Sequence, residues 1–186
     1  MGFDKATAPI GGVPCAVIVA SALGQVARVV LEVGPGVTGH PAVSEEPPGA
    51  GPLAAVATGA RALRERGYAL DTLVVACDFP LVSRAALAVL ASWPGNRSVV
   101  PVVDGHPQPL FARWSPADLA LAADLVVDGA RAMRSLVART GPILVPEHRW
   151  PAGLDRRTLT DVDSPADLDA LGIPWQRPPA PAPLLP

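Results

Sequence analysis

A short apolar run that ends on a carboxylate and a proline constrains this chain more than any other feature. Residues 74–77 read Val-Val-Ala-Cys, and Asp78, Phe79 and Pro80 follow directly. Continuous apolar residues are typical of a strand covered on both faces of a sheet, and proline cannot extend the ladder. In an open α/β sheet ligands bind beyond the carboxyl ends of the strands, so Asp78 lies where a hard metal ion carrying phosphates can be held. An aspartate that only caps a turn has the same sequence pattern.

A segment rich in glycine and proline, residues 48–52, precedes a run of good helix formers that extends to Arg66. Glycines allow backbone amides to approach a ligand closely, and the N-terminus of a helix favours negative charge. Pro52 suits the first helical turn, because the N–H that proline lacks would be unpaired there. No Gly-Lys-Ser or Gly-Lys-Thr follows, so the segment is not a Walker phosphate loop. The alternatives are a ligand-binding loop and a plain tight turn.

Helical and strand patterns alternate along the chain without an internal repeat. Helices are predicted near residues 13–23, 52–66 and 83–92, in two stretches between 117 and 139, and after Ser164, which can cap the last helix. Strands are predicted at 27–33, near 42, and at 72–76, 98–102, 109–114 and 143–145. This alternation is typical of an α/β protein with a doubly wound sheet.

The composition favours a single domain and a small ligand. A chain of 186 residues, 49% hydrophobic and 17% charged, can bury one sizeable core. A net charge of −2 and the absence of a basic run argue against nucleic-acid binding. Two cysteines without the spacing of a zinc or redox site indicate a reducing compartment. The proline-rich end of the chain, residues 173–186, is expected to be a disordered tail.

An uncharged stretch from Ala6 to Ala27 imitates a secretory signal. Asp4 weakens the positive start that such a signal needs, and glycine and proline interrupt the apolar segment. The apolar run is also too short to cross a membrane. A buried helix explains the stretch better, and we expect a cytoplasmic protein without membrane contact.

Five segments, in this order, resemble landmarks of the molybdenum cofactor guanylyltransferase family, a group within the Rossmann-like nucleotidyltransferases. They are Met-Gly-Phe-Asp-Lys at 1–5, Gly-Pro-Leu-Ala at 51–54, Cys-Asp-Phe-Pro at 77–80, Asp-Gly-His-Pro-Gln-Pro-Leu at 104–110 and Asp-Val-Asp-Ser-Pro-Ala-Asp-Leu at 161–168. The likeness covers residues 1–172 and implies one Rossmann-like, doubly wound domain with a mostly parallel sheet. Family members begin with a strand and a Leu-Ala-Gly-Gly loop that have no counterpart here. We therefore expect a sheet without its first strand, a shortened glycine-rich loop and a translation start upstream of Met1.

The resemblance implies an enzyme that transfers GMP from GTP to molybdenum-bearing molybdopterin with Mg²⁺ and releases pyrophosphate. Asp78 would hold the metal, since Mg²⁺ prefers oxygen ligands. Asp163 is either a second ligand or simply the residue before the helix that Ser164 caps. Lys5 matches the family lysine that contacts the nucleotide, and a compact ammonium suits a point contact to phosphate. Lys5 and Asp78 are thus the predicted catalytic residues.

The substrate-binding residues are predicted in two further segments. Gly51, Pro52 and Leu53 match the family segment that lines the guanine pocket, and Glu45 replaces an aspartate that commonly precedes it. Arg131 and Arg134 are three residues apart, which on a helix places both on one face. From there they can grip the terminal phosphate of the pterin through bidentate hydrogen bonds. A solvated helix face is the alternative for the two arginines.

Two other functions are compatible with these residues. The Asp-Val-Asp at 161–163 stands where guanylyltransferases usually show an Asn-x-Asn pair, so a cytidylyltransferase that uses CTP on the same pterin is one alternative. A non-catalytic protein that binds molybdopterin or nucleotide is the other. The expected partners are GTP and molybdopterin, with transient contacts to molybdopterin-synthesis proteins or recipient molybdoenzymes.

Overall fold

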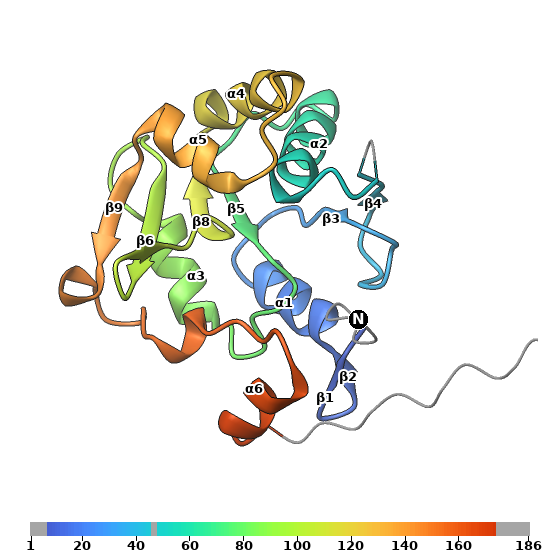
Figure 1. Ribbon diagram of the computed structural model, residues 1–186, viewed down its shortest axis with the longest axis vertical. Coiled ribbons are helices and arrows are strands. Elements are labelled where there is room, and N and C mark those ends of the chain that lie inside the picture. The colour runs from blue at the N-terminus through green and yellow to red at the C-terminus, as the bar shows by residue number, and fades with distance from the viewer. Residues whose placement is uncertain (1–6, 46–47, 174–186) are drawn as a thin grey trace, which may run out of the picture.

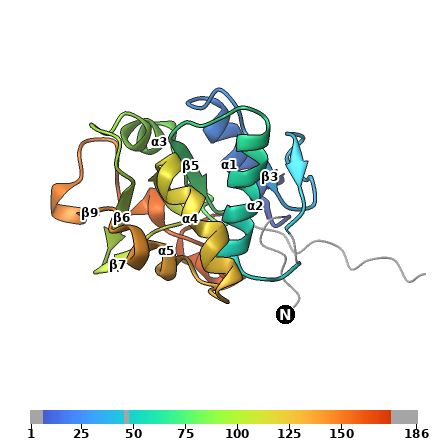
Figure 2. The ribbon, with the colours of Figure 1, turned by 90° about the horizontal axis from the view of Figure 1, so that it is seen from above.

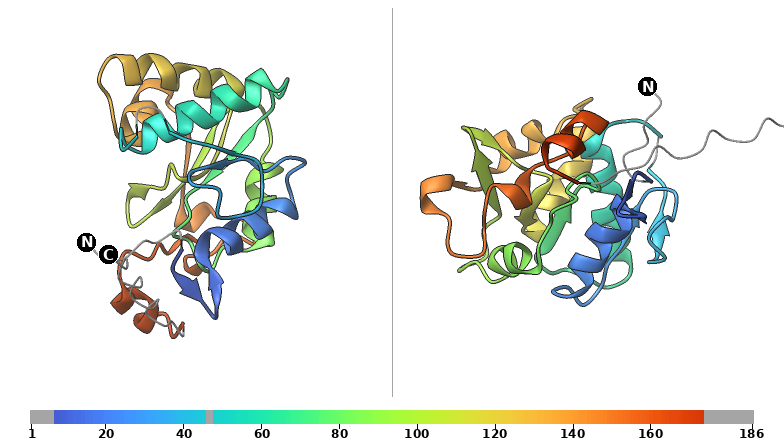
Figure 3. Two further views of the ribbon diagram at one scale, coloured as in Figure 1. Left: turned by 90° about the vertical axis from the view of Figure 1, so that its right-hand side faces the viewer. Right: turned by 90° about the horizontal axis from the view of Figure 1, so that it is seen from below.

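The computed structural model describes residues 7–45 and 48–173 of the chain (Figure 1). Lys5 and residues 174–186 of the expected tail lie outside these ranges. A central sheet lies between two layers of helices, as the side view in Figure 3 shows. One layer contains α2 (Pro52–Glu65), α4 (Pro116–Val127) and α5 (Met133–Thr140), and the other contains α1 (Cys15–Gly24) and α3 (Arg84–Ala91). The predicted doubly wound α/β architecture is therefore confirmed.

The main sheet has five strands, three of which run in one direction. These three are β5 (Thr72–Val75), β6 (Val99–Val103) and β9 (Ile143–Pro146). The other two, β7 (His106–Pro107) and β8 (Phe111–Trp114), run against them. Strand β8 lies between β5 and β6, and β9 pairs with β6.

The pairing is more mixed than the mostly parallel sheet expected from the family, because only the β6–β9 ladder of the main sheet is parallel among the described residues. The cause is local. Residues 104–110 connect β6 to β8, and a parallel pair needs a crossover of about a dozen residues or more. A connection of this length therefore reverses the chain and makes β8 antiparallel to both neighbours.

Two small ladders lie outside the main sheet. Strand β1 (Pro9–Ile10) forms a hairpin with β2 (Val13–Pro14), and β3 (Glu32–Val33) pairs in parallel with β4 (Ala42–Val43). The strand predicted over residues 27–33 is thus corrected to its last two residues, because residues 27–31 form no ladder in the described chain. Within the described ranges strand β5 pairs with β8.

Side-chain caps and proline fix the starts of the helices. Ser83 Oγ accepts a hydrogen bond from Ala86 N at 3.1 Å and begins α3, and Ser115 Oγ caps α4 in the same way. Ser164 begins α6 (Pro165–Ala170) with a reciprocal capping box, as predicted. No helix in the described ranges is both long enough and apolar enough to cross a membrane.

Two hydrophobic clusters pack against opposite faces of the sheet. Val99 and Phe111 belong to the cluster beneath α1 and α3, whereas Val100 and Ala112 belong to the cluster beneath α2, α4 and α5. Successive strand residues point to opposite faces, so each strand supplies both cores. Helices α2 and α4 lie side by side above the second cluster (Figure 2).

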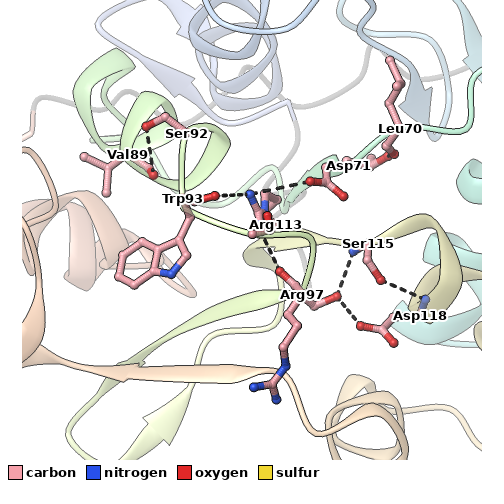
Figure 4. Close-up of polar contacts among 12 residues, drawn as sticks. Leu70, Asp71, Val89, Ser92, Trp93, Arg97, Arg113, Ser115 and Asp118 are labelled. Atoms are coloured by element: carbon pink, nitrogen blue, oxygen red, sulfur yellow. Dashed lines mark hydrogen bonds and ion pairs between the residues drawn. The ribbon is translucent and has the colours of Figure 1, made fainter.

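A buried arginine organises the end of the sheet where β5 and β6 begin (Figure 4). Arg113 is 2% exposed and stands opposite Leu73 on β5. Its guanidinium donates to the backbone oxygens of Trp93, Gly95 and Arg97, at 2.7, 3.0 and 2.7 Å. Asp71, just before β5, lies 3.6 Å from the same group. The buried charge is therefore matched by acceptors from the loop after α3 and by one carboxylate.

Candidate functional site

Three carboxylates gather beyond the carboxyl end of β5. Asp78 follows that strand, and Asp161 and Asp163 lie in the extended segment before α6. Val162 N donates to Asp78 O at 2.9 Å, which fixes this segment across the strand end. One carboxylate oxygen from each aspartate lies within 4.8 Å of the others. Asp78 is half-buried, and the other two aspartates are exposed.

This acidic cluster has the donor chemistry of a hard divalent cation. Carboxylate oxygens are the ligands that Mg²⁺ prefers, and Mg²⁺ sites keep several waters, which suits two exposed aspartates. Three like charges at this separation also repel one another, and a bound cation removes that repulsion. The residues present therefore fit a Mg²⁺ ion. The structure brings the two predicted ligands, Asp78 and Asp163, together, and their role in metal binding stays a prediction.

Asp161 is the member of this cluster that the sequence analysis missed. Val162 is 4% exposed and points into the protein, so its two neighbours both turn outward. In an extended segment residues i and i+2 share a side, which is why Asp161 and Asp163 face the same way. The alternation Asp-Val-Asp was the available signal.

Cys15, the first residue of α1, has a thiol that is influenced by the charge of Asp78. Burial raises the pKa of its thiol to about 12, and negative charge on Cys77 and on Asp78 adds to the rise. The side chain is 2% exposed. A thiol that stays protonated at neutral pH is a packing group and a poor nucleophile.

The glycine-rich loop has a backbone conformation that requires glycine. Gly51, the residue before α2, has φ +103° and ψ 171°, a region that other residues avoid. Its carbonyl accepts from Ala54 N at 3.0 Å, and this bond closes the first turn of α2. Of the other predicted pocket residues, Pro52 is exposed and Leu53 is completely buried. Leu53 therefore packs in the core and can offer a ligand only its backbone.

Glu45 lies against the same loop. Its Oε2 accepts from Gly49 N at 3.1 Å. Its second oxygen, Oε1, is buried and has no hydrogen-bond partner in the described part of the chain. A buried acceptor without a donor is costly, so this oxygen is a candidate contact for the N–H groups of a ligand.

The prediction that Arg131 and Arg134 share a helix face is wrong. Helix α5 begins at Met133, with Ala132 as its N-cap, so Arg131 precedes the helix and only Arg134 lies on it. The Arg131 guanidinium donates to the backbone oxygens of Gly49 and Ala50, at 2.8 and 3.1 Å. Arg131 is therefore engaged with the glycine-rich loop, whereas Arg134 is exposed in the first turn of α5.

Fold and site together describe a single-domain α/β protein with a carboxylate cluster at one strand end and a glycine-rich helix start. Residues 1–143 match the family model of the MobA-like NTP transferase domain. Because the match covers well over half of the 186 residues, the chain belongs to this family. The family suggested by the five sequence segments is thereby confirmed.

Curated relatives and solved structures agree with this assignment. A probable molybdenum cofactor guanylyltransferase of Mycobacterium tuberculosis is 33% identical over 180 residues, covering 91% of this chain and 86% of the relative. One from Chloroflexus aggregans is 30% identical over 131 residues, covering 68% of this chain and 61% of the relative, so the match spans less than two thirds of that protein.

Two solved structures share the fold. Molybdopterin-guanine dinucleotide biosynthesis protein A from Archaeoglobus fulgidus superposes with a TM-score of 0.72 at 18% identity, covering 91% of this chain and 89% of that one. The 2-C-methyl-D-erythritol 4-phosphate cytidylyltransferase of Thermus thermophilus gives 0.63 at 23% identity, with coverages of 90% and 93%. At these identities the likeness establishes the Rossmann-like fold.

Proposed function

We propose that this protein transfers GMP from GTP to molybdenum-bearing molybdopterin and releases pyrophosphate. The observation that carries the proposal is the acidic cluster of Asp78, Asp161 and Asp163 beyond β5, in a chain of the MobA-like family. The names of the curated relatives support the same reaction. In this reaction a phosphate oxygen of the pterin attacks the α-phosphorus of GTP, and the bond from that phosphorus to the bridging oxygen breaks.

The acidic cluster is proposed to bind Mg²⁺. When bound, the ion would supply positive charge against the triphosphate. Asp78, Asp161 and Asp163 would be its protein ligands, with Asp78 held in place by the hydrogen bond from Val162 N to its backbone oxygen. Lys5, which lies outside the described residues, and the exposed Arg134 are proposed to contact nucleotide and pterin phosphates.

The nucleophile needs no general base in this proposal, because a phosphate monoester is already ionised near pH 7. The protein instead positions the two substrates and stabilises charge, as in other phosphoryl transfers. The proposed site residues accordingly include no histidine to act as a general base. The charged side chains proposed to contact metal or phosphate are Asp78, Asp161, Asp163, Arg134 and Lys5.

Glu45 supports guanine as the base. Its buried Oε1 has no donor in the described chain, and guanine offers N–H donors at two adjacent positions of its edge. The backbone of the 49–51 loop lies beside this oxygen, since Glu45 Oε2 accepts from Gly49 N. A carboxylate next to backbone amides can therefore pair with the edge of guanine, which carries N–H donors and a carbonyl acceptor.

CTP is the second candidate nucleotide. The observation that favours it is Asp163, since the resemblance described above implies aspartate at this position in cytidylyl-type proteins and asparagine in guanylyl-type ones. The experiment is calorimetric titration of the full chain with GTP and with CTP, each with Mg²⁺ and with EDTA. Pyrophosphate release is then measured in the presence of molybdenum-loaded molybdopterin.

We expect GTP to bind in the presence of Mg²⁺, CTP to compete weakly, and pyrophosphate to appear only when the pterin is added. Preferred CTP binding would replace the guanylyltransferase by the cytidylyltransferase. If neither nucleotide binds with or without Mg²⁺, the proposed transfer reaction is wrong for this chain.

A further inference from the structure

Arg131 contacts the glycine-rich loop through both its side chain and its backbone. The guanidinium donates from Nη2 to Gly49 O at 2.8 Å and from Nε to Ala50 O at 3.1 Å. On the other side of Gly51, Leu53 N donates to Arg131 O at 3.1 Å. A single residue, 81 positions from Ala50 in the sequence, therefore holds the loop on both sides of Gly51.

The contact leaves no room for a side chain at position 51. A Cβ added to Gly51 would lie 2.9 Å from Arg131 O and 3.3 Å from Arg131 Cβ. Gly49, two residues earlier, has open space around the same position, although it also has a positive φ of +70°. Of these two glycines, only Gly51 lies so close to the Arg131 backbone that a side chain would not fit.

The two side-chain hydrogen bonds determine where the neighbouring amides point. In a trans peptide the C=O and the following N–H lie on opposite sides of the planar unit. Because Gly49 O and Ala50 O both face Arg131, the N–H groups of Ala50 and Gly51 face away from it. Neither N–H donates a hydrogen bond to any group in residues 7–45 and 48–173. Two donors are therefore available in the loop that contacts Glu45, whose Oε1 is buried and has no hydrogen-bond partner in the described part of the chain.

We propose that Arg131 is a positioning residue for nucleotide binding: it orients the amides of Ala50 and Gly51 toward the base of the nucleotide. The proposal rests on the proposed function, because it assigns the loop to the nucleotide site. Arg131 acts through the loop and does not touch the reacting phosphates. Its loss should therefore affect binding of the nucleotide and leave the transfer step unchanged.

The test compares Arg131→Met and Arg131→Lys with the natural chain. For Arg131→Met we expect the Kd and the KM for GTP to rise about tenfold, because two charge-assisted hydrogen bonds to the loop are lost, with kcat within about twofold. Lysine carries the charge but lacks the fixed fork of the guanidinium, so Arg131→Lys should recover part of the affinity. Arg139→Met, which removes an exposed arginine from the last turn of α5, is the matched control and should leave both constants unchanged.

Hydrogen exchange of the peptide that contains residues 48–55 gives a readout independent of activity. Arg131→Met should speed exchange in this loop even without nucleotide, whereas Arg139→Met should not. Unchanged exchange, an unchanged KM, or a loss confined to kcat would each overturn the positioning role. Failure of the natural chain to bind GTP would instead refute the proposed function, and the exchange result would still report whether Arg131 holds the loop.

Discussion

Charged side chains have opposite surroundings at the two ends of β5. Where β5 begins, the single positive charge of Arg113 is buried and surrounded by three backbone oxygens and the Asp71 carboxylate. Where β5 ends, three carboxylates from Asp78, Asp161 and Asp163 gather with their oxygens within 4.8 Å. The first arrangement pairs unlike groups, and the second collects like charges at the surface.

The difference distinguishes a charged side chain that stabilises the fold from charged side chains that are proposed to bind a ligand. A buried charge surrounded by hydrogen-bond acceptors stabilises the fold only as long as all its partners are present. Like charges held together lower the stability of the fold, and the Mg²⁺ ion proposed above would remove this cost at the acidic cluster. Substitutions at the two ends should therefore have opposite signatures: loss of stability at the start of β5 and loss of turnover at its end.

Asp78→Asn should have the largest effect, which is a loss of turnover without a loss of stability. Removing one carboxylate from the proposed metal site is expected to lower the rate of GMP transfer about a thousandfold, equivalent to about 4 kcal/mol in the barrier. The free energy of unfolding should stay the same or rise, because repulsion within the acidic cluster is reduced. Steady-state kinetics and urea denaturation measure the two quantities.

Asp169→Asn, which neutralises an exposed aspartate on α6, is the matched control for the charge change. It should leave turnover and stability unchanged. If Asp78→Asn transfers GMP at the natural rate, the acidic cluster has no part in the reaction and the contrast between the sheet ends fails.

Arg113→Met should have the opposite signature. Its removal leaves the backbone oxygens of Trp93, Gly95 and Arg97 and the Asp71 carboxylate without this donor, so we expect the free energy of unfolding to fall by about 3 kcal/mol. Affinity for GTP should be unchanged in the folded fraction, since Arg113 lies beside the start of β5 and the acidic cluster lies beyond the end of that strand. Urea denaturation, with exposed Arg149→Met as the control, tests the first expectation and calorimetry the second. A variant that folds stably but loses GTP affinity would show that the start of β5 is part of the site.

Local signals made the helices predictable. Pro52 begins α2, and Ser83 and Ser164 cap α3 and α6, as the sequence indicated. A cap depends on residues within one turn of it, so the sequence around each start contains the information needed. Asp78 was placed correctly at a strand end for a similar reason, because the apolar run and the proline mark that end without reference to the rest of the fold.

Features that depend on distant partners were not predictable in the same way. Residues 27–31 have the composition of a strand but form no strand ladder in the described chain, and a ladder is what defines a strand. Spacing alone predicts that Arg131 lies on a helix, although Gly129, with φ +86°, marks the end of α4 just before it. Its real partners are Gly49 and Ala50, and nothing in either segment reveals that contact.

Glu32 is a carboxylate whose charge is stabilised by hydrogen-bond partners, as the charge of Arg113 is. In this it differs from the carboxylates of the acidic cluster. Its oxygens accept from the backbone N–H groups of Gly36, Val37 and Thr38, at 2.7 to 3.0 Å, and from the Thr38 hydroxyl at 2.7 Å. Burial acts to raise the pKa of Glu32, but the bonds from Thr38, Val37 and Gly36 outweigh it and hold this pKa below its ordinary value of 4.5. The ionised carboxylate is thus the form that the folded chain prefers.

The smallest effect is expected from Glu32→Gln, about 1 kcal/mol of unfolding free energy at pH 7, because the amide keeps one acceptor oxygen but loses the charge. A pKa that is lowered on folding contributes its full stability above 4.5 and loses it as the pH falls through the lowered value. The difference between the natural chain and the variant should therefore shrink with acidification below pH 4.5, and urea denaturation across this range measures it. A difference that stays constant or grows on acidification would mean that the loop at residues 36–38 does not favour the charged form of Glu32. Glu32 would then be an unmatched charge, as in the acidic cluster, and not a charge stabilised by hydrogen bonds, as Arg113 is.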